Sequence, residues 1–214
     1  MDDDFGIRIL EETMLQLRGL ASERAMSVSD IVQEALGEYL YTRATGVNFF
    51  DVIQSMENAM RGAGQFVTNA DPSGLALFIK SPLRHVHRPE LKYEVRITRG
   101  GRAAVGTLGV ILRSQDMETL RGFAEFSGLW MALERRYLAR AGQIVYRTDA
   151  GYFGRQIYRP EEGGRGGGQL LGEAISNYIH VFDALLKHYF RHWSGGQEME
   201  PLYLAQLKAG KLTI

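Results

Sequence analysis

The N-terminal part of the sequence is dominated by residues 7–40, which read IRILEETMLQLRGLASERAMSVSDIVQEALGEYL. This stretch begins inside a short apolar run, residues 5–10, in which Ile7 and Ile9 alternate with other side chains as in a β-strand. Residues 11–25 follow with apolar side chains three or four positions apart, which is typical of an amphipathic helix. The stretch therefore predicts a strand followed directly by a helix.

A second helix is predicted to begin after Met26. Ser27 is the expected N-cap, and Asp30 follows three residues later, where its carboxylate can complete a capping box. The helix should continue to about Tyr41, with an apolar side formed by Val28, Ile31, Val32, Ala35, Leu36, Tyr39 and Leu40. A strand and two helices in about 40 residues are too small to bury a core alone, so we expect this unit to need a partner.

Residues 5–41 resemble the ribbon-helix-helix repressors of the Arc, MetJ and CopG type. The order of strand and helices, the small polar turn and the ending Glu-Ala-Leu-x-x-Tyr-Leu carry this resemblance. In that family, two strands pair across a dimer and enter the DNA major groove as a ribbon. The resemblance implies a homodimeric, sequence-specific DNA-binding transcriptional regulator, expected to be a repressor.

The same resemblance implies which residues would contact DNA. Outward positions of the strand read base edges, and here they include Gly6 and Arg8. Arg8 is the expected base reader, because a guanidinium can bond O6 and N7 of guanine together. The N-terminus of the second helix, at Ser27, Val28 and Ser29, is expected to bind a backbone phosphate.

The charge of this unit keeps a second function open. The chain has 25 basic and 25 acidic residues, but residues 1–44 hold nine acids against four arginines. Phosphate contacts supply much of the affinity of proteins for DNA, and an acidic surface opposes them. The alternative is a ribbon-clasped dimeric assembly or partner-binding protein without DNA binding.

The rest of the sequence predicts a connecting helix, residues 45–64, and a larger α+β domain, residues 65–214, after the ribbon-helix-helix domain of residues 1–44. Apolar alternation or helical periodicity defines its elements. Strands are expected at 75–79, 91–97, 105–112, 144–147 and 152–158, and helices at 114–141, 169–193 and 202–208. This order predicts an antiparallel sheet with helices on one face. We expect this domain either to mediate oligomerisation or to act as a sensor that responds to a small-molecule effector.

Two pairs of histidines have spacings compatible with a shared metal ion. His85 and His87 would lie on one side of an extended segment, and His188 and His192 on one face of a helix. These pairs raise the alternative of a metal-responsive regulator with a divalent transition metal, although nothing in the sequence requires a cofactor. The absence of cysteine excludes disulfides and thiolate ligands.

A basic stretch lies between residues 80 and 102, where bases outnumber acids. It is a candidate patch for an anionic effector or for nucleic acid. The proposed members are Arg84, Arg88, Lys92, Arg96, Arg99 and Arg102. The alternative is a solvated strand face followed by a loop.

The other sequence features do not indicate a nucleotide-binding or catalytic site. The glycine-rich run at residues 163–168 lacks the Walker lysine and the Rossmann spacing, so a flexible linker is expected. No catalytic motif is recognisable, and we expect no enzyme, although an active site assembled across the fold is a third possibility. The acidic N-terminus and the lack of a long apolar segment predict a cytoplasmic protein that does not bind membranes.

Overall fold

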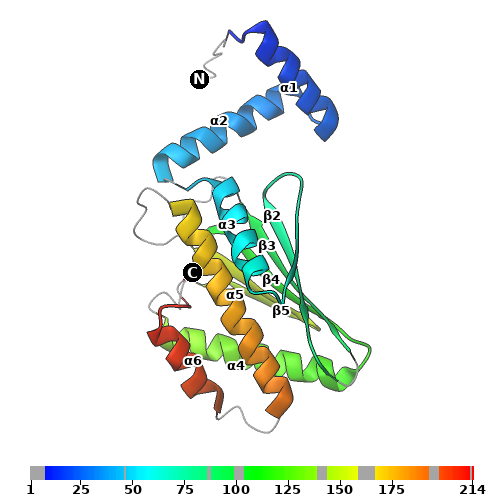
Figure 1. The fold of residues 1–214 in the computed structure, drawn as a ribbon, viewed down its shortest axis with the longest axis vertical. Helices are drawn as coiled ribbons and strands as arrows, with labels where there is room; N and C mark the ends of the chain where they lie inside the picture. Colours follow the sequence, from blue (N-terminus) through cyan, green and yellow to red (C-terminus); the bar gives the residue numbers. More distant parts are fainter. Residues whose placement is uncertain are drawn as a thin grey trace.

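The computed structural model describes residues 8–45, 47–85, 88–98, 104–138, 144–158, 167–192, 198–212 and 214. Within these ranges the chain forms six helices and a six-stranded antiparallel sheet (Figure 1). The predicted α+β class, with antiparallel hairpins and long helices, is therefore confirmed. The helices α3 and α4 contact the strands directly, and α5 meets β3 through the ring contact of Phe182 with Tyr93.

The sheet has the strand order β1-β2-β3-β4-β6-β5, and every neighbouring pair is antiparallel. β4 pairs with β6 rather than with β5, so the hairpin of β5 and β6 joins the hairpin of β3 and β4 through β6. Gly151 turns this second hairpin with a φ of 71°, a left-handed conformation that glycine adopts without strain. The strands are β1 (Val67–Ala70), β2 (Ala76–Pro82), β3 (Glu90–Ile97), β4 (Ala104–Arg113), β5 (Tyr146–Asp149) and β6 (Tyr152–Tyr158).

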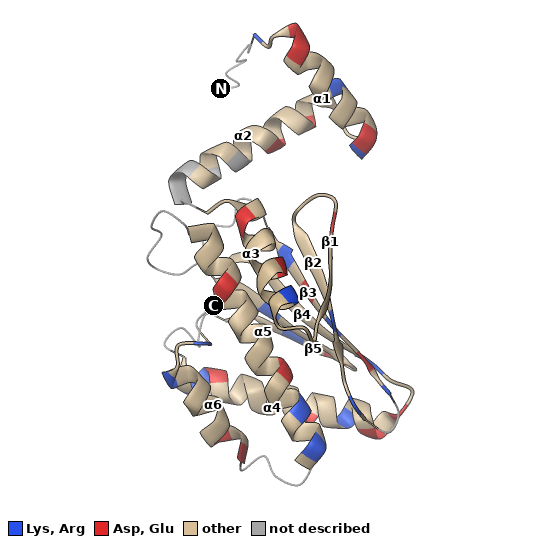
Figure 2. Ribbon diagram, viewed as in Figure 1, with Lys and Arg blue, Asp and Glu red and all other residues tan. Residues whose placement is uncertain are grey.

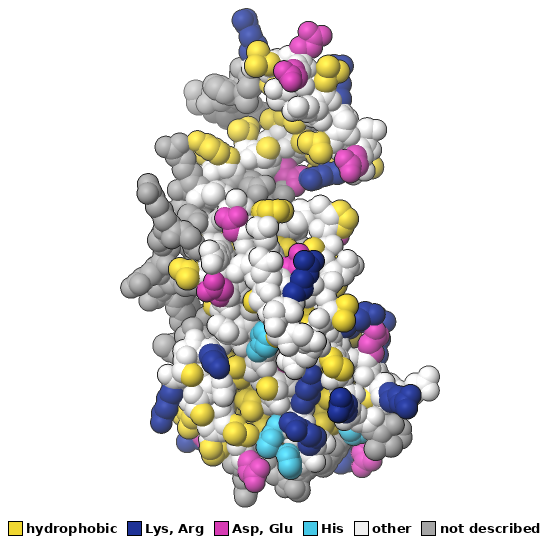
Figure 3. Space-filling view, viewed as in Figure 1, with side chains coloured by type: hydrophobic (Ala, Val, Ile, Leu, Met, Phe, Trp, Pro, Cys, Tyr) yellow, Lys and Arg dark blue, Asp and Glu magenta, His cyan; other side chains and the backbone are white. Residues whose placement is uncertain are grey.

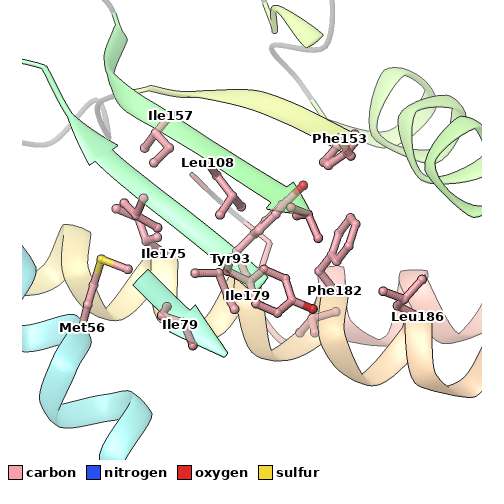
Figure 4. Close-up of a cluster of buried hydrophobic side chains, with 14 of the residues drawn as sticks. Met56, Ile79, Tyr93, Leu108, Phe153, Ile157, Ile175, Ile179, Phe182 and Leu186 are labelled. Carbon is pink, nitrogen blue, oxygen red and sulfur yellow. The ribbon is translucent and has the colours of Figure 1, made fainter. Parts of the chain in front are cut away.

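One face of the sheet forms the core with three helices. These are α3 (Phe49–Gly62), α4 (Met117–Tyr137) and the central α5 (Gly167–His192). Alternation along β3 buries Leu91, Tyr93, Val95 and Ile97, as the sequence predicts. Figure 4 shows side chains of α5, such as Phe182, meeting Tyr93 and residues of the strands. α6 (Met199–Lys208) packs beside α5.

The segment expected to connect the two parts of the chain is packed into the core. α3 lies along α5, and its apolar stripe is buried at Phe49, Val52, Ile53, Met56 and Met60. Gly167 and Gly168, expected within a linker, instead begin α5 and face α3. The preceding residues, 159–166, lie outside the described part of the chain.

Some element boundaries differ from the sequence prediction. α4 is capped by Asp116, whose Oδ2 accepts a 2.8 Å hydrogen bond from the Thr119 N–H, and not by Ser114. The helix ends at Tyr137, and Leu138 is extended. β1 was not predicted, because Val67–Ala70 has little apolar alternation and its pairing with β2 defines it.

The expected ribbon is not supported. Gly6 and Ile7 lie outside the described residues, and residues 8–10 form no strand in this single chain. The described chain begins instead with two helices, α1 (Glu11–Arg24) and α2 (Val28–Thr45). Figure 1 shows this helical pair at one end of the molecule, beyond α3 and the sheet.

Candidate functional site

The turn between α1 and α2 has the hydrogen bonds that its sequence predicts. The Asp30 N–H donates to Ser27 Oγ at 3.1 Å, and the Ser27 N–H donates to Asp30 Oδ2 at 3.2 Å. This is a reciprocal capping box that fixes the start of α2. Ala25 ends α1 in the left-handed conformation, with a φ of 52°. The two helices are therefore joined by a defined turn rather than by a linker.

This helical pair buries very little of its apolar surface within one chain. In the described part of the pair, Ala21 and Ile31 are the only apolar side chains that are buried. Seven others are between 40% and 79% exposed, namely Leu10, Leu15, Leu20, Met26, Leu36, Tyr39 and Leu40. Figure 3 shows hydrophobic side chains on the surface of α1 and α2. Leu36, Tyr39 and Leu40 lie three or four residues apart and so share one side of α2.

The charges of the pair are mixed along both helices (Figure 2). Arg24 of α1 and Glu34 of α2 form an ion pair that joins the two helices, with a distance of 3.6 Å from Nη1 to Oε1. Arg8 is exposed just before α1, and Ser27 and Ser29 are exposed at the start of α2. Val28 is half-buried, and Gly6 lies outside the described residues. The structure thus leaves Arg8 and Ser29 exposed on separate elements, whereas the N–H and hydroxyl of Ser27 are bonded to Asp30.

A small cavity of about 220 Å³ separates the helical pair from the rest of the molecule. Leu20, Arg24 and Ile31 line it from the pair, and Phe49 and Leu75 are among the residues that line it from the other side. Direct packing between the two parts is therefore incomplete.

Among the described residues, the histidines of the predicted metal site do not come together in one group of potential ligands. The rings of His188 and His192 are adjacent, with centroids 4.5 Å apart, while Nε2 of His188 lies 3.6 Å from Glu198 Oε2. His85 contacts the ring of Phe190 and approaches Thr119 instead. His87 lies outside the described residues. Where the structure describes the chain, it contains no group of three or more potential ligands for a metal ion.

The predicted basic patch is divided between two places. Lys92 and Arg96 lie on the strand β3, where they pair with Glu90 and Glu94 respectively. Lys80 of β2 also pairs with Glu90. Arg84 and Arg88 instead belong to the loop between β2 and β3, and Arg99 and Arg102 lie outside the described residues. An acid therefore neutralises each described base of β3, whereas Arg84 and Arg88 lie on a different element.

Two buried polar clusters were missed by sequence reasoning. In the first, Glu134 of α4 pairs with Arg155 of β6, with 3.0 Å between Oε1 and Nε. Tyr178 donates to Glu134 Oε1 at 3.0 Å and Tyr146 donates to Oε2 at 2.8 Å. Burial raises the pKa of the Glu134 carboxyl, while Arg155 opposes that shift. Strand alternation does place Arg155 beside Phe153 on the inner face, but nothing local identifies its partner.

The second cluster joins β2, β3 and α5. Asp183 accepts hydrogen bonds from Ser81 at 2.6 Å and Tyr93 at 3.0 Å, and Lys187 Nζ lies 2.7 Å from Oδ2. Lys187 also donates to Ser81 Oγ at 2.7 Å. A serine beside a lysine resembles a nucleophile beside a base, but here the ammonium is engaged by Asp183. The cluster satisfies a buried carboxylate and holds the helix to the sheet.

Comparisons with protein families, curated proteins and solved structures find no match to this chain. The function must therefore be argued from its own residues. In the described part of the chain, no helix is long and apolar enough to cross a membrane.

Proposed function

We propose that this protein is a dimeric, sequence-specific DNA-binding transcriptional regulator that contacts DNA through its N-terminal unit. Residues 1–44 pair with the same unit of a second chain and bind the operator, and the α+β part serves as an effector or oligomerisation domain. The observation that carries the proposal is the exposed apolar surface of α1 and α2. Of the twelve large apolar side chains exposed in the described residues, seven lie between Leu10 and Leu40.

An isolated helical pair with this surface is unfavourable in water. Each large apolar side chain that becomes buried gains about 1.5–3 kcal/mol, and α1 and α2 bury few of theirs within one chain. A second copy offers the same surface and can bury both together in a symmetric interface. The resemblance of residues 5–41 to ribbon-helix-helix repressors gives such an interface a DNA-binding role.

The DNA contacts follow from the positions that the resemblance assigns. Arg8 is exposed ahead of α1, so it can reach a base edge from a strand formed between two chains. The first N–H groups of a helix lack acceptors within the helix, and those of α2 can bind a phosphate. The capping box at Ser27 holds the start of α2 in place for this contact.

The acidic charge of the unit favours a second candidate, a dimeric partner-binding assembly without DNA. Between residues 8 and 45, six acids oppose four arginines, and Asp2, Asp3 and Asp4 precede them. Such an assembly would use the same exposed apolar side chains. It differs from the regulator in having no preference for any DNA sequence.

Genomic DNA distinguishes the two functions. The full chain is incubated with fragmented genomic DNA at about 100 mM salt, and the retained fragments are sequenced. We expect enrichment of a palindromic or repeated site that is lost in Arg8→Ala. Arg18→Ala is the matched control, because Arg18 is an exposed arginine of the same unit and its loss changes the charge equally. No enrichment, or equal losses in both variants, would refute sequence reading by Arg8.

A further inference from the structure

A cavity lies where the loop between β2 and β3 meets the C-terminal end of α5. Its volume is about 590 Å³, which is within the usual range of small-molecule sites. The residues that line it are Leu83, Arg84, His85, Arg88, Phe190 and Arg191. Figure 3 shows basic and histidine side chains gathered at this end of the molecule, opposite α1.

The charge of this cavity is unlike that of the neighbouring surface. Three arginines line it, and none of the described residues that line it is acidic. By contrast, Arg113 and Arg121 each lie within ion-pair distance of a glutamate. No described carboxylate neutralises Arg84 or Arg88 in this way. Concentrated positive charge in a concave surface attracts an anion and strengthens its binding.

The cavity is also fixed in shape by its contacts. The His85 ring packs edge-on against Phe190, with centroids 5.4 Å apart, and its Nδ1 lies 3.5 Å from Thr119 Oγ1. The Arg88 N–H donates to the His85 carbonyl oxygen at 3.0 Å. Arg191 Nε donates to the Lys187 carbonyl at 3.2 Å. These bonds fix the backbone of Arg88 and the side chain of Arg191, and both residues line the cavity.

The lining has an apolar part as well. Leu83 and Phe190 are nearly buried, yet both border the cavity. Guanidinium groups bind carboxylate and phosphate oxygens through paired hydrogen bonds, whereas Leu83 and Phe190 can contact carbon. Single-stranded nucleic acid stacks its bases on exposed aromatic rings, and Phe190 is only 7% exposed. The combination favours a small ligand with both an anionic and an apolar part.

We propose that this cavity binds a small organic anion, with its phosphate or carboxylate on Arg84, Arg88 and Arg191 and its apolar part against Leu83 and Phe190. The role of this anion as the effector rests on the proposed regulatory function, whereas the binding itself does not. An effector acts only if it binds one arrangement of the two parts better than another.

Calorimetry on the full chain tests the site with defined probes. Phenyl phosphate and benzoate represent the two anionic groups, inorganic phosphate lacks the apolar part, and benzyl alcohol lacks the charge. We expect saturable binding of at least one aromatic anion with a Kd below about 1 mM. Inorganic phosphate should bind several-fold more weakly, and benzyl alcohol should not bind. No saturable binding of either aromatic anion would overturn the proposal.

The variants Arg84→Ala and Arg88→Asn assign the binding to this cavity. Asparagine is used at Arg88 because the backbone φ there is +43°, which asparagine tolerates well. The double variant should bind at least about tenfold more weakly, because the charge-assisted hydrogen bonds from two guanidinium groups to the anion are lost. Arg61→Ala is the control, because Arg61 is exposed on α3 and does not line this cavity. Equal affinities for the double variant and the wild type would place the anion elsewhere.

The outcome is separable from that of the DNA experiment. Anion binding is measured without DNA, and Arg8→Ala should leave it unchanged. If duplex DNA, but neither aromatic anion, loses affinity in the double variant, the arginines contact nucleic acid and the small-anion site is refuted. Arg84→Lys with Arg88→Lys retains the charge and should recover part of the anion affinity if the variant cavity is intact.

Discussion

Gly172 of α5 lies against the backbone of Val52 in α3. A Cβ atom added to Gly172 would be 2.6 Å from the Val52 carbonyl oxygen and 2.7 Å from Ser55 Cβ. Gly168, one turn earlier, would place a Cβ 2.6 Å from the Asn48 carbonyl oxygen. Only residues without a side chain allow the two helices to approach so closely. This contact anchors α3, the helix that follows α2 in the chain, to α5.

Gly172→Ala should therefore destabilise the protein. Overpacking of this kind costs about 1–3 kcal/mol, because the nearest atom is the backbone carbonyl oxygen of Val52, which cannot move aside easily. The control is Gly128→Ala in α4, where nothing lies within 4 Å of the added Cβ and alanine favours the helix. Urea unfolding should show a lower midpoint for the first variant only. Equal midpoints would contradict the close packing of α3 on α5.

The buried pair of Glu134 and Arg155 predicts a second change in stability. Glu134→Gln removes the charge that compensates a fully buried guanidinium, which should lower the free energy of unfolding by about 3–5 kcal/mol. Replacing both residues, as Glu134→Gln with Arg155→Met, should restore much of this loss. Glu125→Gln, at an exposed pair with Arg121, should change stability by less than about 1 kcal/mol. If the single and double variants were equally unstable, the uncompensated charge would not be the cause.

The exposed side of α2 predicts how the chain associates. We expect the wild type to sediment as a dimer and Leu36→Glu with Leu40→Glu to shift it toward monomer, because charge would be buried in the interface. The control is Leu170→Glu, which makes the same substitution at a leucine that is 57% exposed but lies on α5. A shift in the Leu170 variant alone would place the interface on the α+β part.

Glu90 of β3 predicts a measurable effect of pH on its ion pairs with Lys80 of β2 and Lys92 of β3. Hydrogen bonding to Lys92, and then to Lys80, lowers the pKa of the Glu90 carboxyl below its ordinary value of 4.5. The ion pairs therefore stabilise the fold above that value, and their contribution is lost as pH falls through the lowered pKa. In an NMR titration, Lys92→Ala should raise the pKa of Glu90. An unchanged pKa would show that Lys92 does not contact it in solution.

Much of the α+β part was predictable because its elements have strong local patterns. Alternation in Leu91–Ile97 identified β3, and helical spacing identified α4 and α5. The pairing of β4 with β6 was not predictable, since it joins strands separated by α4. Nor did any local pattern place Glu134 beside Arg155, because their contact depends on how α4 crosses the sheet.

The N-terminal unit shows a different limit. The capping box at Ser27 and Asp30 was predictable from four residues, because all of its bonds are local. The predicted buried side of α2 is instead largely exposed at Leu36 and Leu40 in the single chain. The pattern indicates that these side chains need a contact, but not which molecule provides it. A strand that forms only by pairing with a second chain cannot form in a single chain.

Fluorescence anisotropy with the enriched DNA site tests the central claim most directly. At about 100 mM salt, the wild type should bind this site at least about a thousandfold more tightly than a scrambled duplex. Arg8→Ala should lose most of that difference, and Arg18→Ala should weaken both duplexes alike and keep it. Equal affinity of the wild type for the two duplexes would contradict sequence-specific binding by the N-terminal unit.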